Sequence, residues 1–319
     1  MQARKHMAKT ARALLPPCLA LVMAAAGTGC SINNMVANRL TGDGGAAAVF
    51  TSDPDPELVG AALPFAIKMY ETLLYTNPTH EGLMLTTGML FVMYANAFVQ
   101  APADMLPFYE WEAREAGLER AKRLYLRGHE ILLRGLEQRH RGFAAAAQSE
   151  EAMRAFAHRF RPRDVDFMYW AVLSGLAAYS VDIFDFELAI RIPIWHVMME
   201  RVIELAPDKD GLDDFLVLYF ASLPEMLGGD VGRARSHFMR AMERSGWTST
   251  GALVSYARNI SVPEQDFDTF EERLLRVLAI NPDDNPSTRL MTILDQRRAR
   301  WLLDNAHDFF AFLPFPDDF

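Results

Sequence analysis

Apolar residues recur at intervals of three and four positions along most of the chain from residue 57 onward. No stretch there keeps the apolar–polar alternation of a half-buried strand, so the sequence predicts an all-α protein. Helix ends are predicted at Asn77-Pro78, Ala206-Pro207 and Asn281-Pro282. Helix starts are predicted where acceptor side chains or prolines suit a first turn: Asp53–Glu57, Asp164, Asp210–Asp214, Ser261–Glu264 and Asn285–Ser287.

A spacing of four, three and five residues recurs among these predicted helices and resembles the second helix of a tetratricopeptide unit. It is seen at Ala66, Tyr70, Leu73 and Pro78, at Trp195, Met199, Val202 and Pro207, and at Phe270, Leu274, Val277 and Pro282. Its first three positions recur as Ala121, Tyr125 and Gly128 and as Ala234, Phe238 and Ala241. Small residues at such positions let helices approach closely. We therefore expect a solenoid of about four or five degenerate tetratricopeptide-like helix hairpins.

Two segments, 82–103 and 167–181, carry no charge until Asp104 and Asp182 and could suggest membrane spans. The first contains Thr86 and Asn96 and has no basic residue nearby, so both are interpreted as buried central helices. The C-terminal segment 309–316 is strongly apolar, and we expect it to cover the last hairpin.

The first thirty residues have the profile of a signal peptide. Four basic residues precede an apolar run, Ala13–Ala26, which is shorter than the roughly 20 residues that a membrane-spanning helix needs. Gly27–Ser31 then resembles a bacterial lipobox, with Gly27 where Leu is usual, and this predicts lipidation of Cys30. Ordinary signal cleavage is the alternative. Residue 31 is Ser, which favours the outer membrane. We expect a signal peptide at 1–29, a lipidated tether at 30–52 and one helical domain at 53–319.

Composition narrows the function classes. Half of the 319 residues are apolar and the net charge is −9, so disorder and nonspecific nucleic-acid binding are both disfavoured. The two cysteines, Cys18 and Cys30, leave the body of the chain without a disulfide framework or a catalytic thiol. No HExxH, P-loop, GxGxxG, GxSxG or CxxC motif occurs. We therefore expect no enzyme activity, no cofactor and no metal site.

Three weaker signals have ordinary structural explanations. His129 and His140 lie eleven residues apart and lack an evident third metal ligand. Segment 208–214 resembles a calcium loop but has Leu212 at an oxygen position, so a helix N-cap is preferred. Asp182, Asp185 and Glu187 form an acidic cluster that a hydrolase could use only if it were buried beside substrate. A solvated turn is the simpler interpretation.

The order of several segments resembles the TatT family, lipoproteins associated with tripartite ATP-independent periplasmic (TRAP) transporters. The segments are 52–59, 62–74, 94–104, 120–128, 166–170, 221–230 and 297–303, within a match from about Cys30 to Phe310. The resemblance implies a non-catalytic, periplasm-facing lipoprotein of cryptic tetratricopeptide hairpins that associates with a periplasmic TRAP-type solute-binding protein. It also implies self-association, with a trimer expected, and an apolar channel for a hydrophobic or carboxylated ligand.

Two functional hypotheses follow. In the first, the concave face of the solenoid is a scaffold that docks the solute-binding protein of a TRAP transporter. In the second, the chain is a carrier that itself binds a small apolar ligand in a helical channel. Each candidate contact taken singly also fits a core position, but as a set they suggest a lined channel: Tyr94, Asn96, Phe98 and Gln100, with Tyr169 and Trp170.

Overall fold

The computed structural model describes residues 46–313, and the regular secondary structure in this range is entirely helical, which confirms the all-α prediction. The predicted signal peptide and Cys30 lie outside the described residues. The helices are α2 (Ala46–Thr51), α3 (Pro56–Thr76), α4 (Glu81–Ala95), α5 (Ala101–Asp104), α6 (Trp111–Arg139), α7 (Phe143–Ala146), α8 (Glu150–Ala157), α9 (Val165–Ser180), α10 (Phe186–Ala189), α11 (Ile192–Leu205), α12 (Leu212–Ser222), α13 (Val231–Arg244), α14 (Thr250–Tyr256), α15 (Val262–Glu264), α16 (Phe267–Ala279) and α17 (Arg289–Asp304).

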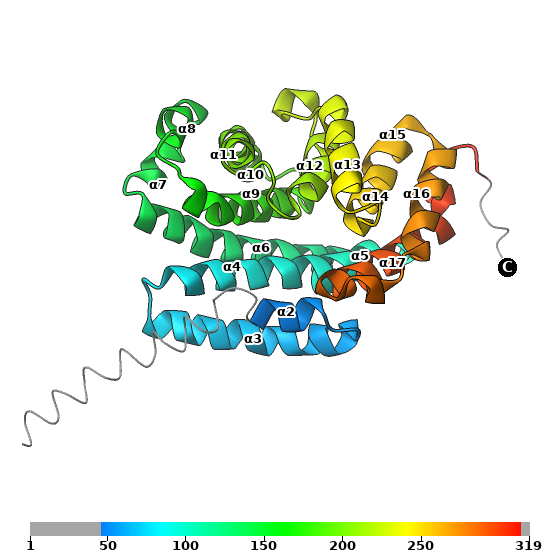
Figure 1. Cartoon of the computed structure of the whole chain (residues 1–319), viewed down its shortest axis with the longest axis horizontal. Helices are drawn as coiled ribbons and strands as arrows, with labels where there is room; N and C mark the ends of the chain where they lie inside the picture. The colour runs from blue at the N-terminus through cyan, green and yellow to red at the C-terminus, as the bar shows by residue number, and fades with distance from the viewer. Residues whose placement is uncertain (1–45, 314–319) are drawn as a thin grey trace, which may run out of the picture.

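Helices that follow one another along the chain pack as neighbours. One series runs α3, α4, α6, α9 and α11, and a second joins α12, α13, α14, α16 and α17 (Figure 1). In addition, the last helix, α17, packs against α2 and α3 near the beginning of the described chain. An ideal solenoid makes contacts only between adjacent repeats. Here the first and last helices also meet, so the array closes on itself.

The recurring small and apolar positions lie on buried helix faces. Several residues of the recurring spacing are fully buried, among them Ala121, Tyr125, Val202, Ala234 and Leu274. Ala66, Tyr70, Phe238 and Phe270 are also buried. The three predicted helix ends are confirmed, because α3, α11 and α16 end at Thr76, Leu205 and Ala279.

Glycines allow α4 and α6 to pack closely against each other. A Cβ added at Gly128 of α6 would lie 2.9 Å from the carbonyl oxygen of Gly88 in α4, and one added at Gly88 would lie 2.5 Å from Leu132 Cγ. Such distances are too short for any larger side chain without moving a helix. The small residue at position 128 is therefore required by packing.

Two of the predicted helix starts behave differently from one another. Asp55 caps α3 as expected, with its side chain accepting a hydrogen bond from the Leu58 amide at 3.0 Å. The prediction at Ser261–Glu264 is wrong, because this segment continues α14 through a π-helix and ends at Glu264. The next helix, α16, instead starts after the N-cap Asp266. Pro263 fits the first turn of a new helix, but a proline also occurs after a widened helical turn, and this is its position here.

The uncharged segment 82–103 forms α4 and its continuation. The run Glu81–Asp104 is long and apolar enough to cross a membrane by length and composition, and half of its most apolar window is buried inside the fold. The packing of α4 against α3, α6 and α9 accounts for its apolar character. The second uncharged segment is α9, which packs between α6 and α11.

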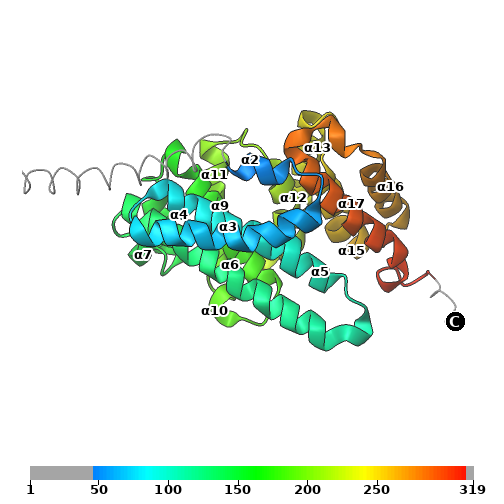
Figure 2. The same ribbon diagram turned by 90° about the horizontal axis from the view of Figure 1, so that it is seen from below.

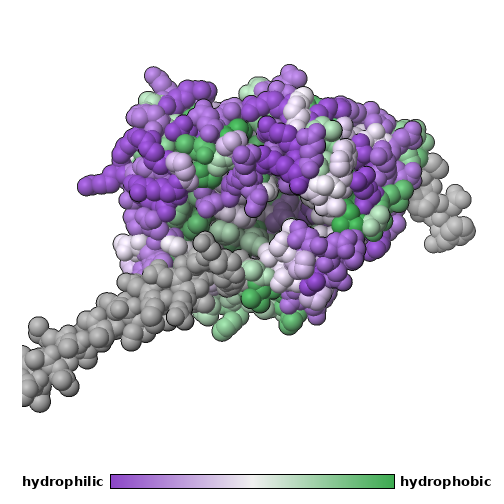
Figure 3. All heavy atoms as spheres, viewed as in Figure 1, coloured by the Kyte–Doolittle hydropathy of each residue, from purple (hydrophilic) through white to green (hydrophobic). Residues whose placement is uncertain are grey.

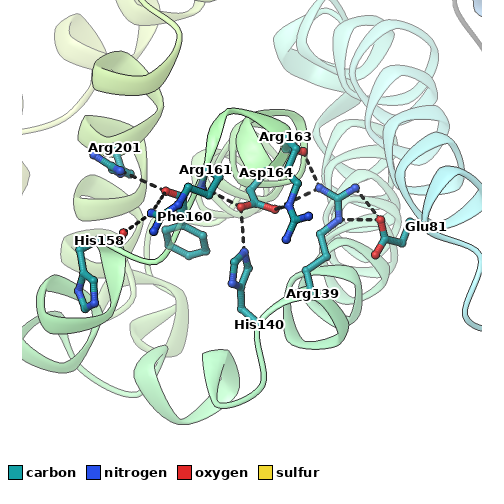
Figure 4. Close-up of polar contacts among 9 residues, drawn as sticks. All are labelled: Glu81, Arg139, His140, His158, Phe160, Arg161, Arg163, Asp164 and Arg201. Carbon is teal, nitrogen blue, oxygen red and sulfur yellow. Dashed lines mark hydrogen bonds and ion pairs between the residues drawn. The ribbon is translucent and has the colours of Figure 1, made fainter.

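A buried polar network lies where the start of α4, the end of α6 and the start of α9 meet (Figure 4). The Asp164 carboxylate, fully buried, accepts hydrogen bonds from His140 Nε2 at 2.8 Å and from the Arg161 amide at 2.9 Å. Arg139 lies 3.2 Å from the same carboxylate and also binds Glu81 at 2.7 Å. The network therefore ties the start of α9 to the end of α6 and the start of α4.

The C-terminal aromatic residues cover the last hairpin as predicted, as far as Leu313. Phe310 is buried, with its ring centroid 5.3 Å from that of Phe267 and 4.9 Å from that of Phe270, both on α16. Residues 314–316 of the predicted segment lie outside the described range.

Candidate functional site

A cavity of about 370 Å³ lies where the first and last helices meet. Its walls come from the start of α3, the end of α4 with the segment that follows, and one face of α17. In the space-filling view, the surface is hollowed near the centre of the molecule, and hydrophilic atoms lie at the bottom of the hollow (Figure 3). The volume falls in the range typical of small-molecule sites, about 300–1,000 Å³.

One wall of the cavity is a π-helix, Asn96–Gln100, which connects α4 to α5. A second π-helix, Ala257–Ser261, connects α14 to α15. Each is followed two residues later by a proline, Pro102 and Pro263. A proline ring clashes with the carbonyl four residues earlier in a regular α-helix, and a wider turn relieves this clash. π-Helical turns of this kind are frequent at functional sites.

The ring of Phe98 forms part of the apolar wall, and its position is set by a glycine. A Cβ added at Gly60 of α3 would lie 2.7 Å from Phe98 Cδ1, so only glycine lets the ring pack there. Tyr94 stacks beside it, with ring centroids 6.2 Å apart, and its hydroxyl accepts a hydrogen bond from Arg120 at 3.1 Å. Met105, Met291 and Leu294 complete the apolar side.

The other side of the cavity is polar. Asp295 of α17 lines it, is 6% exposed, and accepts a hydrogen bond from Thr250 Oγ1 at 2.7 Å. Burial raises the pKa of Asp295 and also that of Asp104, although nearby arginines oppose both shifts. Asn96 and Arg298 also face the cavity. The site is therefore amphipathic: one half presents rings and thioethers and the other presents hydrogen-bonding and charged groups.

An ion pair closes the site at the surface. Both terminal nitrogens of Arg297 contact the Glu57 carboxylate, at 2.6 and 3.1 Å. These residues are 240 positions apart in the sequence, so the pair connects the first turn of α3 to α17. The fork of an arginine on a carboxylate fixes the relative orientation of the two helices.

Three of the six predicted contact residues, Tyr94, Asn96 and Phe98, line this cavity. Gln100 lies behind the wall, where its Oε1 accepts a hydrogen bond from the buried Tyr125 hydroxyl at 2.6 Å. Tyr169 and Trp170 do not line it. They pack edge to face against each other on α9, and Tyr169 contacts Phe215 of α12. The six residues thus do not form one lining, and a contact role for the latter three stays a prediction.

Among the cavity residues that sequence reasoning missed are four of α17: Met291, Leu294, Asp295 and Arg298. They lie almost 200 positions after Tyr94, and no local pattern connects the two segments. The one available signal was an aspartate and an arginine spaced three residues apart within an amphipathic helix, which is ordinary for a solvated face.

The acidic cluster has a structural partner. Lys122 of α6 lies 2.7 Å from Asp182 and 2.6 Å from Asp185, and Asp185 also caps α10 by accepting from the Leu188 amide at 3.1 Å. The cluster therefore fixes the loop before α10 on α6. Across residues 46–313, no three His, Cys, Asp or Glu side chains are grouped so as to hold a metal ion.

Segment 208–214 contains the N-cap of a helix, as predicted, but no aspartate side chain caps it. The N-cap of α12 is Gly211, with a positive φ of 72° and no side-chain hydrogen bond. Asp213 instead turns inward and binds His237 Nδ1 at 2.7 Å.

Comparison with known proteins identifies the class of this fold. Residues 52–310 match the family described as TRAP transporter T-component. An uncharacterized protein of Treponema pallidum (strain Nichols) is 35% identical over 266 residues, which is 82% of each chain. This match implies a role in TRAP transport, which is consistent with a place in the bacterial envelope. The chain belongs to the TRAP transporter T-component family.

Proposed function

We propose that the protein is a non-catalytic scaffold that associates with the periplasmic solute-binding protein of a TRAP transporter. The observation that carries this proposal is the family match, which covers 52–310 and thus nearly the whole helical fold. In this proposal the protein lies on the periplasmic side of the outer membrane and is anchored there by lipid on Cys30. Anchoring of this kind requires acyl chains, each buried methylene contributing about 0.8 kcal/mol.

Exposed apolar side chains support a docking role. Phe108, Tyr109 and Trp111 lie at the start of α6, and a second group lies on the loop around α10, where Phe184 and Phe186 are 80% and 79% exposed. Figure 2 shows the first turns of α6 and α10 on the same side of the molecule. Large exposed aromatic residues that gather on one side are typical of protein interaction sites. We assign the solute-binding protein to this side.

The test is an affinity pull-down of the lipidated protein from detergent-solubilised membranes, with mass spectrometry of the partners. Recovery of a periplasmic solute-binding protein in fixed stoichiometry is expected. Phe184→Ser combined with Phe186→Ser should remove that partner. The matched control is Phe65→Ser with Tyr75→Ser, which alters two residues of α3 that are 76% and 87% exposed, and it should retain the partner. Failure of the unaltered protein to recover any solute-binding protein would reject the scaffold.

A second candidate function is that of a carrier for a small apolar ligand, and the cavity of about 370 Å³ between α4 and α17 favours it. Native mass spectrometry of the purified protein is the direct test. A bound small molecule that is lost when Met291→Trp fills the cavity supports the carrier. The same measurement gives the subunit number, for which we propose a homotrimer.

A further inference from the structure

Exposed arginines gather where the chain passes from α6 to α9. Residues 141–163 contain five exposed arginines and two exposed glutamates, although the whole chain has a net charge of −9. One of the five, Arg154, pairs with Glu150 on α8. The other four form a surface that we call the arginine patch: Arg141, Arg159, Arg161 and Arg163. The space-filling view shows a hydrophilic surface over α7 and α8 (Figure 3).

Contacts to the backbone keep the patch together. Arg159 donates a hydrogen bond to the carbonyl oxygen of Arg141 at 3.3 Å, which places the loop after α8 beside the end of α6. Arg161 donates to the carbonyl oxygen of Phe160 at 3.1 Å, and the carbonyl of Arg163 accepts from Arg139 (Figure 4). The four arginines therefore lie at one end of the molecule, around the end of α6.

The carboxylates beside the patch already have partners. Glu137 accepts hydrogen bonds from two backbone amides, at 3.0 and 2.7 Å. Asp164 is fully buried, and Arg139 contacts both Asp164 and Glu81. Residues 137–164 together with Glu81 contain six arginines and five carboxylates, so the local balance stays positive. The buried and paired carboxylates leave the exposed guanidinium groups of the patch able to bind a further anion.

The patch is remote from the aromatic side that we assign to the solute-binding protein. α6 has 29 residues and is therefore about 43 Å long. Arg141 follows its last turn, whereas Phe108 and Trp111 lie at its beginning. Lys122, in the first half of α6, binds the loop before α10. A partner on the aromatic side thus leaves the patch free for a different surface.

Phosphate groups are the natural partner of such a surface in an envelope protein. The planar fork of a guanidinium matches the oxygens of a phosphate. An anionic phospholipid layer presents these groups side by side, so several arginines can bind it at once. The rest of this acidic chain is repelled by the same layer, because like charges repel. The patch is therefore the end of the molecule that such a layer attracts.

We propose that the arginine patch binds the anionic phospholipid surface of the membrane and directs the beginning of α6, with its aromatic residues, into the periplasm. This inference deepens the scaffold function, because it rests on the membrane location proposed above and adds the orientation of the molecule. Lipid on Cys30, at the far end of the predicted tether 30–52, would keep the protein near the membrane without fixing which end faces it.

The first test measures co-sedimentation with vesicles. The chain is made from Ser31 onward, which keeps all the described residues and carries no acyl group. It should bind vesicles of phosphatidylethanolamine and phosphatidylglycerol at low salt. It should not bind vesicles in which phosphatidylcholine replaces phosphatidylglycerol, and high salt should release it.

The variant that tests the patch is Arg141→Gln with Arg163→Gln. Within residues 46–313, the Arg141 side chain makes no hydrogen bond or ion pair, and Arg163 reaches only Asp164, at 3.9 Å, so the fold should be retained. Binding should weaken about thirtyfold, since each basic residue near an anionic surface contributes about fivefold. The matched control, Arg123→Gln with Arg300→Gln, makes the same change of charge at two exposed arginines elsewhere and should keep the affinity.

The second test measures orientation in the lipidated protein on the same anionic vesicles. Cys18 lies in the predicted signal peptide and Cys30 is the predicted lipid site, so one added cysteine provides a single site for a fluorophore. Ala145→Cys on α7 and Ala113→Cys near the start of α6 replace exposed alanines. Energy transfer to a labelled lipid should be stronger from position 145, and Arg141→Gln with Arg163→Gln should remove the difference.

Three results would overturn the inference: no binding to the anionic vesicles, equal binding to both kinds of vesicle, or equal loss in the patch variant and its control. Equal energy transfer from positions 113 and 145 would reject the orientation. A circular dichroism melt identifies a folding defect, and Arg141→Lys with Arg163→Lys, which keeps the charge, should then retain most of the binding. The scaffold is judged separately by its pull-down, and the vesicle test needs no lipid on Cys30.

Discussion

Replacing Asp164 by asparagine tests the polar network that ties α4, α6 and α9 together. The carboxylate is 0% exposed, and its two oxygens accept from His140, Arg161 and Arg139 at 2.8, 2.9 and 3.2 Å. The asparagine amide has the same shape but keeps only one acceptor oxygen. Its NH₂ group, at the position of the other oxygen, would face an N–H donor instead of accepting a hydrogen bond from it. Loss of charge-assisted bonds worth about 1.5–3 kcal/mol each, partly compensated by relaxation, predicts a destabilisation of about 3 kcal/mol.

Thermal and urea denaturation followed by circular dichroism measure this change. For a domain of this size, 1 kcal/mol corresponds to about 2–4 °C, so the melting temperature should fall by about 6–12 °C at pH 7. Burial by itself raises the pKa of Asp164, but the Arg161 amide, His140 and Arg139 outweigh it and the net pKa is lowered. The stabilisation is therefore complete above the unfolded-state pKa of about 3.9 and is lost as the pH falls through the folded-state value.

The control is Glu150→Gln, which makes the same carboxylate-to-amide change in an exposed pair with Arg154. Surface pairs of this kind contribute about 0–1 kcal/mol. If Asp164→Asn is no more destabilising than Glu150→Gln at pH 7, the network does not stabilise the fold as argued. The difference between the unaltered protein and Asp164→Asn should also shrink below about pH 4.

Three further predictions follow from other parts of the fold. Gly128→Val should cost about 3 kcal/mol in urea denaturation, because its side chain would meet the α4 backbone. Gly232→Ala should change stability by less than about 1 kcal/mol, because the added Cβ would meet only the side-chain oxygen of Asp230, at 3.2 Å. Burial lowers the pKa of His129 to about 4, so its NMR signals should show a neutral ring at pH 6. The fold should also lose stability as the pH falls from about 6.5 toward 4, because the unfolded chain binds a proton at this histidine before the folded chain does. Cys30→Ser should move the protein from the membrane to the soluble fraction on cell fractionation, and retention in the membrane would contradict lipidation at this residue.

The two π-helices position residues at and near the cavity, and each precedes a proline in the sequence. Pro102 and Pro263 each follow such a turn, and the turns place Asn96 at the cavity and Arg258 near Asp104. Sequence reasoning interpreted the second of these prolines as a helix start. A proline is compatible with both situations, and only the helix that continues before it distinguishes them.

The pattern of apolar residues determined the helical class and the buried faces that carry Tyr70, Phe238 and Phe270, and the prolines at 78, 207 and 282 determined the ends of α3, α11 and α16. These features depend on interactions within a few residues or on the 3.6-residue period, so a single chain contains the information. The sequence indicated six candidate contacts, each of which also fits a core position, and three of them, Tyr94, Asn96 and Phe98, line the cavity.

Tertiary structure alone decided that α17 packs against α3 and encloses a cavity. The contact between Glu57 and Arg297 joins residues 240 positions apart. A contact between such distant segments produces no repeating pattern in the sequence from which it could be predicted. The same closure brought Arg298 and Phe98 into the lining of one cavity, although the helix that carries Arg298 has the spacing of an ordinary solvated face. Local sequence specifies which residues form helices and which faces are buried, whereas the site exists only because two distant helices meet.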